Sequence, residues 1–257
     1  MKLLTWNIQA GIGTGRYRDY LLRAHLQLVH APSKTAAIEN IAREIAPYDV
    51  VCLQEVDLGG RRAGYRSQVD DIAALSGHPH VALQENRRIP GISRHGNAIL
   101  SHWPITQVRD LKLPGRMPGR GCLVVDIAGK PALTVACLHL SLGRSDQRLQ
   151  LTAVAQAVLG AHAWAVLGDF NCGARSAPLE AFCEATGAHL QRPAPPTFPA
   201  WRPNRDFDHI VVGGALAVTH YQCEPATFSD HRAISAAVRQ AVGGEARTAT
   251  TGPATAA

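Results

Sequence analysis

Polar and ionisable side chains lie at the ends of short apolar runs along this chain. Asn7 comes directly after LLTW, Glu55 after VVCLQ and His139 after LTVACL. The second half of the chain repeats the pattern at Asp169, Asn171, Asp208, Asp230 and His231. If these runs are strands, their ends converge at one edge of a sheet, where loops gather side chains around a ligand. We therefore expect one pocket that holds carboxylates, amides and imidazoles together.

The chemistry of such a pocket follows from its donor atoms. Clustered carboxylates repel each other unless a cation neutralises them, and oxygen donors favour Mg²⁺ or Mn²⁺ over Zn²⁺. The twelve histidines do not indicate zinc, because the sequence has neither an HExxH motif nor a tight His and Cys cluster. A hard cation beside histidines and arginines suits phosphoryl chemistry: the metal polarises a phosphoryl oxygen, histidines stabilise the developing charge, and an Asp orients or deprotonates water.

The elements that must position these side chains are predicted from apolar periodicity. Short runs rich in β-branched residues and bounded by Gly, Pro, Asp or Asn are typical of buried strands. Such runs occur at residues 3–6, 50–53, 98–100, 123–127, 133–138, 164–167, 210–212 and 233–238. Helical spacing predicts helices over 36–45 and 149–159, and a third with Pro178 in its first turn that runs towards Thr186. We expect a mixed α/β domain dominated by strands.

Other segments are less regular. Residues 13–32 are basic and aromatic, and we expect a short helix or a substrate-facing loop there. The five prolines within 187–206 predict an irregular loop. The sequence shows no internal repeat and no linker. We expect one domain over residues 1–240 and a disordered tail over 241–257.

Length and composition limit the class of protein. Of 257 residues, 46% are hydrophobic and 18% charged, which excludes disordered and collagen-like chains. No apolar stretch approaches the roughly 20 residues that cross a bilayer, and the N-terminal sequence lacks a signal-peptide pattern. We expect a soluble, cytoplasmic protein whose six scattered cysteines are buried free thiols. The formal charge of +6 favours anionic partners.

Each motif alone also has an ordinary structural explanation. An Asn after a strand is commonly a turn residue, GDFN can be an Asx turn before a helix, and an Asp-His pair can lie in a solvated loop. Chance rarely places all of these motifs at strand ends in one chain. Their combination is what indicates a site.

Taken in order, the motifs resemble those of the endonuclease/exonuclease/phosphatase superfamily, the deoxyribonuclease I and exonuclease III class of metal-dependent phosphoesterases. The matching segments span residues 3 to about 238 and are TWNIQ (5–9), LQEVD (53–57), GNAILSHWPI (96–105), HLSL (139–142), GDFNCG (168–173), FDHIVV (207–212) and SDHRAI (229–234). GDFN followed about 60 residues later by SDH is the specific part of this signature. The resemblance implies a four-layer α/β sandwich, in which two packed, mostly antiparallel sheets are flanked by helices.

The resemblance also implies a metal site and a catalytic set. Glu55 is expected to be the main Mg²⁺ ligand, with Asn7 and Asp230 in or next to the metal shell and with Mn²⁺ able to substitute. The expected catalytic residues are Asp169, which positions the attacking water; Asn171, which binds a phosphoryl oxygen; His231, which contacts the phosphate; Asp208, which fixes the tautomer and charge of His231; and His139, a second phosphate-binding histidine.

The segment around His139 distinguishes branches of the superfamily. HLS resembles the deoxyribonuclease I, sphingomyelinase and inositol-phosphate phosphatase branches, whereas apurinic-site nucleases usually carry a tyrosine-containing segment there. In deoxyribonuclease I the corresponding histidine has a glutamate partner, for which Glu85 is the candidate in this chain. The loop TFPAWRP (197–203) is similar to a loop of short bacterial members that have no assigned substrate.

Three functions compete. The favoured hypothesis is a Mg²⁺-dependent phosphodiesterase or phosphatase acting on a small or lipid-derived phosphoester, with Arg116, Arg120 and Arg202 as the first candidates for substrate contact. The alternative is an endo- or exonuclease acting on DNA or RNA, which is disfavoured because aromatic residues make up only 5% of the chain. A third hypothesis, a catalytically silent binding module, predicts a broken site, whereas every expected polar position is filled.

Overall fold

Two β-sheets form the centre of the protein, which a computed structural model describes over residues 1–241. The first sheet has the strand order β11-β12-β1-β2-β4-β3, with β11 (Leu216–Cys223), β12 (Ile234–Gln240), β1 (Lys2–Asn7), β2 (Val50–Asp57), β4 (Ser93–Ser101) and β3 (His80–Ile89). The second has the order β5-β6-β7-β8-β10-β9, with β5 (Ile105–Lys112), β6 (Gly121–Ile127), β7 (Leu133–His139), β8 (Ala163–Asp169), β10 (Asp208–Gly214) and β9 (His189–Leu190). In each sheet one pair of neighbouring strands is parallel, β1 with β2 and β7 with β8, and the other pairs are antiparallel.

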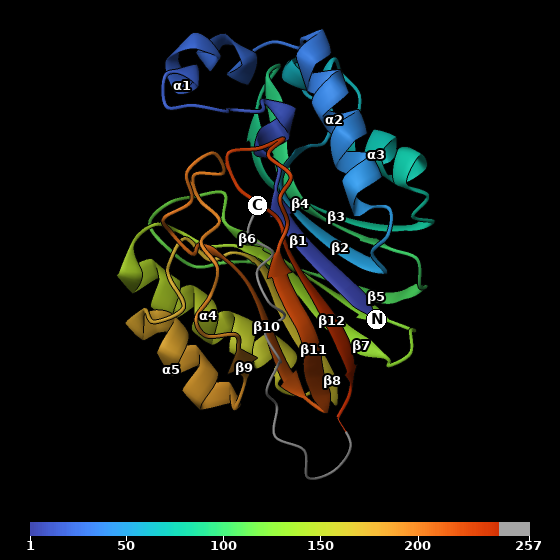
Figure 1. The fold of residues 1–257 in the computed structure, drawn as a ribbon, viewed down its shortest axis with the longest axis vertical. Helices are drawn as coiled ribbons and strands as arrows, with labels where there is room; N and C mark the ends of the chain where they lie inside the picture. The colour runs from blue at the N-terminus through green and yellow to red at the C-terminus, as the bar shows by residue number, and fades with distance from the viewer. Residues whose placement is uncertain (242–257) are drawn as a thin grey trace.

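Helices cover the outer face of each sheet (Figure 1). α2 (Pro32–Ile45) and α3 (Gln68–Ser76) pack on the first sheet, and α4 (Arg144–Val158) and α5 (Ala177–Thr186) pack on the second. The remaining helices are short: η1 (Gln9–Gly11), α1 (Asp19–Leu22), η2 (Ala24–Gln27) and η3 (Arg61–Ala63). The order helix, sheet, sheet, helix confirms the expected four-layer α/β sandwich with two mostly antiparallel sheets.

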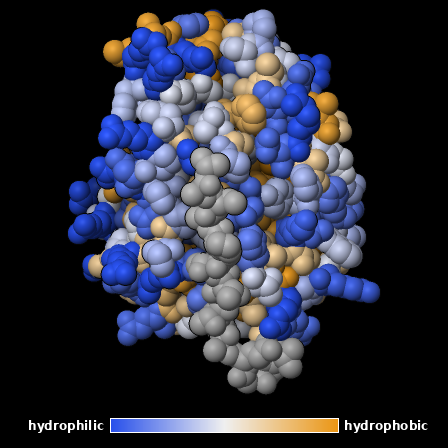
Figure 2. Space-filling model, in the orientation of Figure 1, coloured by the Kyte–Doolittle hydropathy of each residue, from blue (hydrophilic) through white to orange (hydrophobic). Residues whose placement is uncertain are grey.

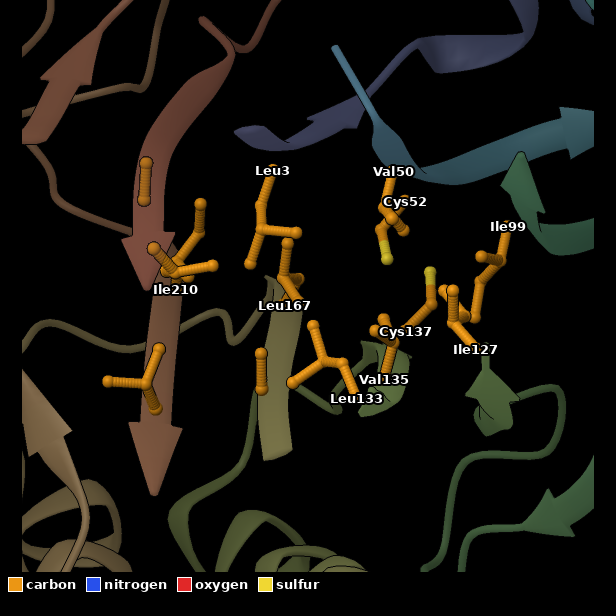
Figure 3. Close-up of a cluster of buried hydrophobic side chains, with 14 of the residues drawn as sticks. Leu3, Val50, Cys52, Ile99, Ile127, Leu133, Val135, Cys137, Leu167 and Ile210 are labelled. Atoms are coloured by element: carbon orange, nitrogen blue, oxygen red, sulfur yellow. The ribbon is translucent and has the colours of Figure 1, made fainter. Parts of the chain in front are cut away.

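Alternating side chains of the central strands build three apolar layers. In β1, Leu3 points between the two sheets, whereas Leu4 points towards α2 and α3. In β7, Val135 lies between the sheets and Ala136 faces α4 and α5. Figure 3 shows the middle layer, in which residues of the first sheet such as Leu3 lie opposite residues of the second such as Leu167. Because both faces of these strands are buried, their sequences are continuous apolar runs, which explains why they were predictable.

The helix boundaries follow local signals. α5 begins after Ser176, has Pro178 in its first turn and ends at Gly187, whose φ of 62° is left-handed, as expected for a helix C-terminus. α2 and α4 begin at Pro32 and Arg144, earlier than the apolar periodicity predicted, because their first turns are mostly polar. α3 was not predicted from the sequence.

Further expectations concern the irregular segments, the cysteines, membrane-spanning helices and the C-terminal tail. Residues 13–32 contain the short helices α1 and η2, and 187–206 is irregular except for the two-residue strand β9, which the loop prediction missed. All six cysteines are free thiols, four of them buried, whereas Cys183 and Cys223 are only half-buried. Within the described residues no helix is long and apolar enough to span a membrane. The predicted tail falls almost wholly on 242–257, outside the described residues.

Candidate active site

Three strands of the second sheet bring polar side chains together at one edge. Because β7 and β8 run parallel in register, the terminal residues His139 and Asp169 are neighbours. β10 runs antiparallel to β8 and begins with Asp208 directly opposite Asp169. His139 Nε2 lies 3.5 Å from Asp169 Oδ2. The register of the sheet therefore places all three side chains in one row.

The first sheet contributes Asn7 and Glu55 to the same edge. Asn7, the last residue of β1, donates through Nδ2 to Asp169 Oδ2 at 3.1 Å and to Glu55 Oε1 at 3.3 Å, so its amide links the two sheets. Glu55 lies in an irregularity of β2 between Leu53 and Val56 and has a φ of 57°. A bulge redirects a side chain, and a left-handed non-glycine residue marks a position that its surroundings hold under strain.

The loop before β12 adds Asp230 and His231. β12 pairs with β1, with Ile234 opposite Thr5, so the preceding loop reaches the end of β1. Two hydrogen bonds fix it there: Ser229 Oγ donates to Asn7 O at 2.7 Å, and Trp6 Nε1 donates to His231 O at 2.9 Å. Asp230 and His231, which are more than 220 residues away from Asn7 in the sequence, thus complete the site.

His231 is held between two buried carboxylates. Its Nδ1 donates to Asp208 Oδ2 at 2.8 Å, and its Nε2 lies 3.8 Å from Asp169 Oδ2. Thr197 Oγ1 also donates to Asp208 Oδ2, at 2.6 Å. Burial lowers the pKa of His231, but the charges of Asp208 and Asp169 outweigh burial and raise this pKa to about 10. The imidazole is therefore positively charged at neutral pH.

Asp169 and His139 have pKa values that suit proton transfer and neutral hydrogen bonding. Burial, assisted by the charge of Asp208, raises the pKa of Asp169 to about 7, although His231 and Asn7 oppose this shift. Burial and the nearby Arg120 hold the pKa of His139 well below its usual value, so this ring is neutral. A carboxyl group with a pKa near neutrality can accept a proton from water at physiological pH.

Asn171 is fixed by the turn that follows β8. Its backbone N–H donates to Asp169 Oδ1 at 2.9 Å, and its Nδ2 donates to Leu140 O at 2.9 Å. Its φ of 51° is left-handed, as is common for Asn in such turns. The GDFN motif therefore is an Asx-type turn, and that turn carries Asn171 beside Asp169. The motif is therefore both a structural turn and the element that positions a candidate site residue.

Tyr20 of α1 belongs to this site but was not singled out in the sequence. Its hydroxyl donates to Asp230 Oδ2 at 2.8 Å. Burial raises the pKa of Tyr20, and the charge of Asp230 adds to that shift. The basic and aromatic composition of 13–32 predicted a short helix or a substrate-facing loop, yet nothing in its spacing distinguished Tyr20 from Tyr17.

Arg120 is the loop arginine that reaches the site. It lies in the loop between β5 and β6 and is half-buried; burial lowers its pKa, whereas the charges of Asp169 and Glu55 raise it. Arg120, Glu55 and His139 line a pocket of about 330 Å³. By contrast, Arg116 and Arg202, the other first candidates, are exposed.

Glu85 does not serve as the partner of His139. Arg88 Nε donates to Glu85 Oε1 and Arg94 Nε donates to Glu85 Oε2, both at 2.7 Å. These two arginines lower the pKa of Glu85 to about 2. The deoxyribonuclease I pattern suggested a glutamate for this role, but the carboxylate nearest to His139 in the structure is Asp169.

The donor atoms fit a hard divalent cation. Among residues 1–241, ligand atoms of Asp169, Asp208 and His231 lie within 4.8 Å of one another, a spacing that could hold a metal ion. Within this group, Asp208 Oδ2 already accepts a hydrogen bond from His231 Nδ1. The group also differs from the metal ligands expected from the sequence, which are Asn7, Glu55 and Asp230. Glu55 has a raised pKa because it is buried and faces the charge of Asp230, a repulsion that a nearby cation would relieve.

Comparison with known proteins identifies relatives over most of the chain. The protein-family model described as "Endonuclease/Exonuclease/phosphatase family" matches residues 4–231. The uncharacterized protein YbhP of Escherichia coli K12 is 30% identical over 92% of this chain and 95% of its own length.

Solved structures share the fold. An endonuclease/exonuclease/phosphatase from Beutenbergia cavernae DSM 12333 superposes with a TM-score of 0.74 at 20% identity, covering 94% of this chain and 72% of that one. A mannosyl-6-phosphatase from Bacteroides thetaiotaomicron VPI-5482 superposes with a TM-score of 0.70 at 16% identity, covering 93% and 99% of the two chains. At these identities the likeness concerns the architecture.

Proposed function

Because the chain belongs to the endonuclease/exonuclease/phosphatase family, whose members hydrolyse phosphoester bonds, we propose that it is a Mg²⁺-dependent phosphodiesterase or phosphatase. The observation that carries this proposal is the buried group formed by Asp208, His231 and Asp169, in which a charged imidazole lies beside a carboxyl group whose pKa is about 7. This group supplies a proton acceptor and a positive hydrogen-bond donor at the same place, as hydrolysis of an anionic ester requires.

Glu55 and Asp230 are the residues that would hold the cation, with Asn7, whose Nδ2 donates to Glu55, next to the metal shell. Carboxylate oxygens are hard donors, which Mg²⁺ prefers and Mn²⁺ accepts. When bound, the cation would polarise a phosphoryl oxygen and offset the negative charge of the ester. Tyr20 would orient Asp230 through its hydrogen bond, as outer-shell groups do in metal sites.

The remaining residues would bind the ester and move protons. Asp169 would orient the attacking water and accept its proton. His231, held by Asp208, would donate a hydrogen bond from Nε2 to a phosphoryl oxygen and stabilise the charge that develops on it. The neutral His139 and the amide of Asn171 would hold the other phosphoryl oxygens, so that water attacks in line with the leaving group.

A compact phosphoester, small or lipid-derived, is the favoured substrate. The pocket next to Glu55 and His139 measures about 330 Å³, which suits a headgroup or a small metabolite. Arg120 and Arg87 line this pocket and would attract an anion. The same positive charge favours the alternative, a nuclease that contacts a phosphate backbone.

We place the protein in the cytoplasm, which is consistent with its six free cysteines.

A panel assay tests the proposal. The purified protein is incubated with Mg²⁺, Mn²⁺ or EDTA and with bis-p-nitrophenyl phosphate, p-nitrophenyl phosphate, supercoiled plasmid, single-stranded DNA, RNA, or vesicles of phospholipid or sphingomyelin. We expect metal-dependent hydrolysis of small or lipid esters while nucleic acids stay intact. Metal-dependent cleavage of plasmid or RNA would establish the nuclease instead. A fall in substrate affinity of about 10³-fold or more between 50 and 200 mM salt would also indicate a nucleic-acid substrate.

A further inference from the structure

The segment from residue 15 to 30 exposes several large apolar side chains to solvent. Leu21 and Leu22, in the four-residue helix α1, are 84% and 65% exposed. Tyr17, Leu28 and Val29 of the same segment are also exposed. We call residues 15–30 the rim segment. In Figure 1 it projects beyond the ends of the strands, and Figure 2 shows apolar and strongly hydrophilic side chains next to each other at that end of the molecule.

Arginines lie among these apolar side chains. Arg16 and Arg18 are exposed on the rim segment, and Arg61 of the adjacent helix η3 donates through Nε to Leu28 O at 3.1 Å. Tyr65, in the loop after η3, adds a further ring that is 72% exposed. Exposed leucine and tyrosine side chains mixed with arginines are typical of protein surfaces that lie on an anionic bilayer.

The rim segment borders the candidate active site. The hydroxyl of Tyr20 reaches Asp230, and Leu28 lines the pocket that contains Glu55 and His139. Ile89 and Met117, both partly exposed, line the same pocket. The apolar surface of the rim segment therefore continues into the mouth of the pocket.

The inner wall of the pocket is polar. Asn97 and Arg62 are almost completely buried, and within the described part of the chain Asn97 Oδ1 and Arg62 Nη2 have no hydrogen-bond partner. Both residues line the pocket. Arg62 also pairs through Nε with Asp57. The guanidinium groups of Arg87 and Arg120 line the same pocket and can bind an anionic group of a ligand. The pocket thus combines an apolar mouth with a polar interior.

We propose that the rim segment docks on an anionic phospholipid bilayer and that the adjacent pocket receives a phosphate-containing lipid headgroup. The leucines would enter the interface between headgroups and acyl chains, the arginines would contact lipid phosphates, and the polar interior would bind the headgroup. The headgroup part of this inference rests on the proposed function, whereas the docking part does not.

A nucleic acid is the rival partner, because arginines and exposed tyrosines can also bind a phosphate backbone and stack on bases. Stacking needs aromatic rings, however, and the two most exposed apolar residues of the rim segment are the aliphatic Leu21 and Leu22. A bilayer accommodates aliphatic and aromatic side chains alike. The composition of the rim segment therefore favours the bilayer.

The test is a vesicle co-sedimentation experiment with matched leucine variants. The full chain is mixed with phosphatidylcholine vesicles that contain either no anionic lipid or 30% phosphatidylglycerol. Leu21→Ser/Leu22→Ser removes the apolar tip without touching the pocket. Leu149→Ser/Leu159→Ser is the control, because these leucines are 56% and 52% exposed at α4, on the opposite sheet. Hydrolysis of bis-p-nitrophenyl phosphate is measured in parallel for all three proteins.

We expect the wild-type protein to bind the phosphatidylglycerol vesicles, with binding at least tenfold weaker for Leu21→Ser/Leu22→Ser and unchanged for the control. Hydrolysis of the soluble ester should be equal in all three. Absence of vesicle binding by the wild-type protein, or equal binding by both variants, would overturn the docking proposal. So would tight binding of a single-stranded oligonucleotide that abolishes vesicle binding by the wild-type protein. Inactivity towards the soluble ester would contradict the proposed function alone.

Discussion

The site at the strand ends and the rim segment beside it are built in different ways. At the strand ends, each side chain is placed by a strand register and then fixed by a neighbour, as when Asn7 links Glu55 to Asp169. The rim segment lies outside both sheets and is held by a few individual contacts. Examples are the bond from Lys34 Nζ to Leu26 O and that from Tyr20 to Asp230.

This difference separates the reaction from the choice of substrate. Packing of the two sheets determines where the acid, base and phosphate-binding groups lie, so the positions of these groups cannot shift without altering the fold. The rim segment can change its exposed side chains at little cost to stability, because those side chains pack against little. Substitutions in the two regions should therefore affect different quantities.

The largest effect is expected for Asp169→Asn. This substitution removes the proton acceptor, so kcat for bis-p-nitrophenyl phosphate should fall about 10³-fold. The melting temperature should change little, because the carboxyl group has a raised pKa and Asn is of the same size. Activity within tenfold of wild type would show that Asp169 is a structural residue.

His231→Gln should reduce kcat by about 10²- to 10³-fold through loss of the positive hydrogen-bond donor. The Trp6 indole bonds the backbone of residue 231, so that contact survives the substitution. Circular dichroism and thermal melting establish that the variant folds. If the melting temperatures of Asp169→Asn and His231→Gln both differed strongly from that of the wild-type protein, these two residues would belong to the core of the fold rather than to a site.

Arg120→Met should mainly raise KM, by about 10- to 100-fold, because the half-buried guanidinium lines the pocket in which the anionic substrate would bind. Arg202→Met is the matched control, since Arg202 is an exposed loop arginine that does not line the pocket. Equal kinetics for the two variants would remove Arg120 from substrate binding. A loss confined to kcat would instead give Arg120 a role in the transition state.

Tyr20→Phe tests the contact between the two regions. It removes the hydrogen bond to Asp230, and we expect a loss of about tenfold in kcat/KM together with a rise in the Mg²⁺ concentration needed for half-maximal activity. Tyr17→Phe should have no effect, because Tyr17 contacts Trp201 through its ring. A Tyr20→Phe variant with wild-type kinetics at every Mg²⁺ concentration would mean that the rim segment does not influence the site.

The smallest effect concerns Lys34, which supports the rim segment from α2. Burial, assisted by Arg62, lowers the pKa of Lys34 to about 8. In the unfolded chain the pKa of this lysine is about 10.4. Between pH 8 and 10 the unfolded state therefore binds more protons than the folded state, and the free energy of unfolding rises with pH. Relative to Lys34→Met, the wild-type protein should gain about 1 kcal/mol in the free energy of unfolding between pH 7 and 9. Denaturant titrations at both pH values measure this difference, and parallel pH dependence would contradict it.

The sequence predicted the central strands and missed the edges. β3, β5, β9 and β11 are the four edge strands of the two sheets, and none of them was predicted. An edge strand that faces solvent carries polar residues; β5 has only half-buried and exposed positions and so has no apolar run. The central strands are buried on both faces, which is why their pattern was clear.

The candidate site residues that the sequence predicted are those where a strand end and a motif coincide. All the predicted metal and catalytic positions lie at one edge of the sandwich, with Asn171 brought there by its turn. Tyr20 and Arg120 come from segments without a motif, and only the tertiary fold shows which aromatic or arginine residue reaches the site. Glu85 was suggested by sequence order alone, whereas its neighbours on β3 and β4 supply the arginines that bind it.

The central claim is that Glu55 and its neighbours support metal-dependent hydrolysis of a phosphoester. The most direct measurement is hydrolysis of bis-p-nitrophenyl phosphate by EDTA-treated protein during titration with Mg²⁺, for the wild-type protein and for Glu55→Ala. We predict activity that appears only with Mg²⁺ in the wild-type protein and that is lost in Glu55→Ala without a change in circular dichroism. Equal and Mg²⁺-independent activity in the two proteins would contradict the account.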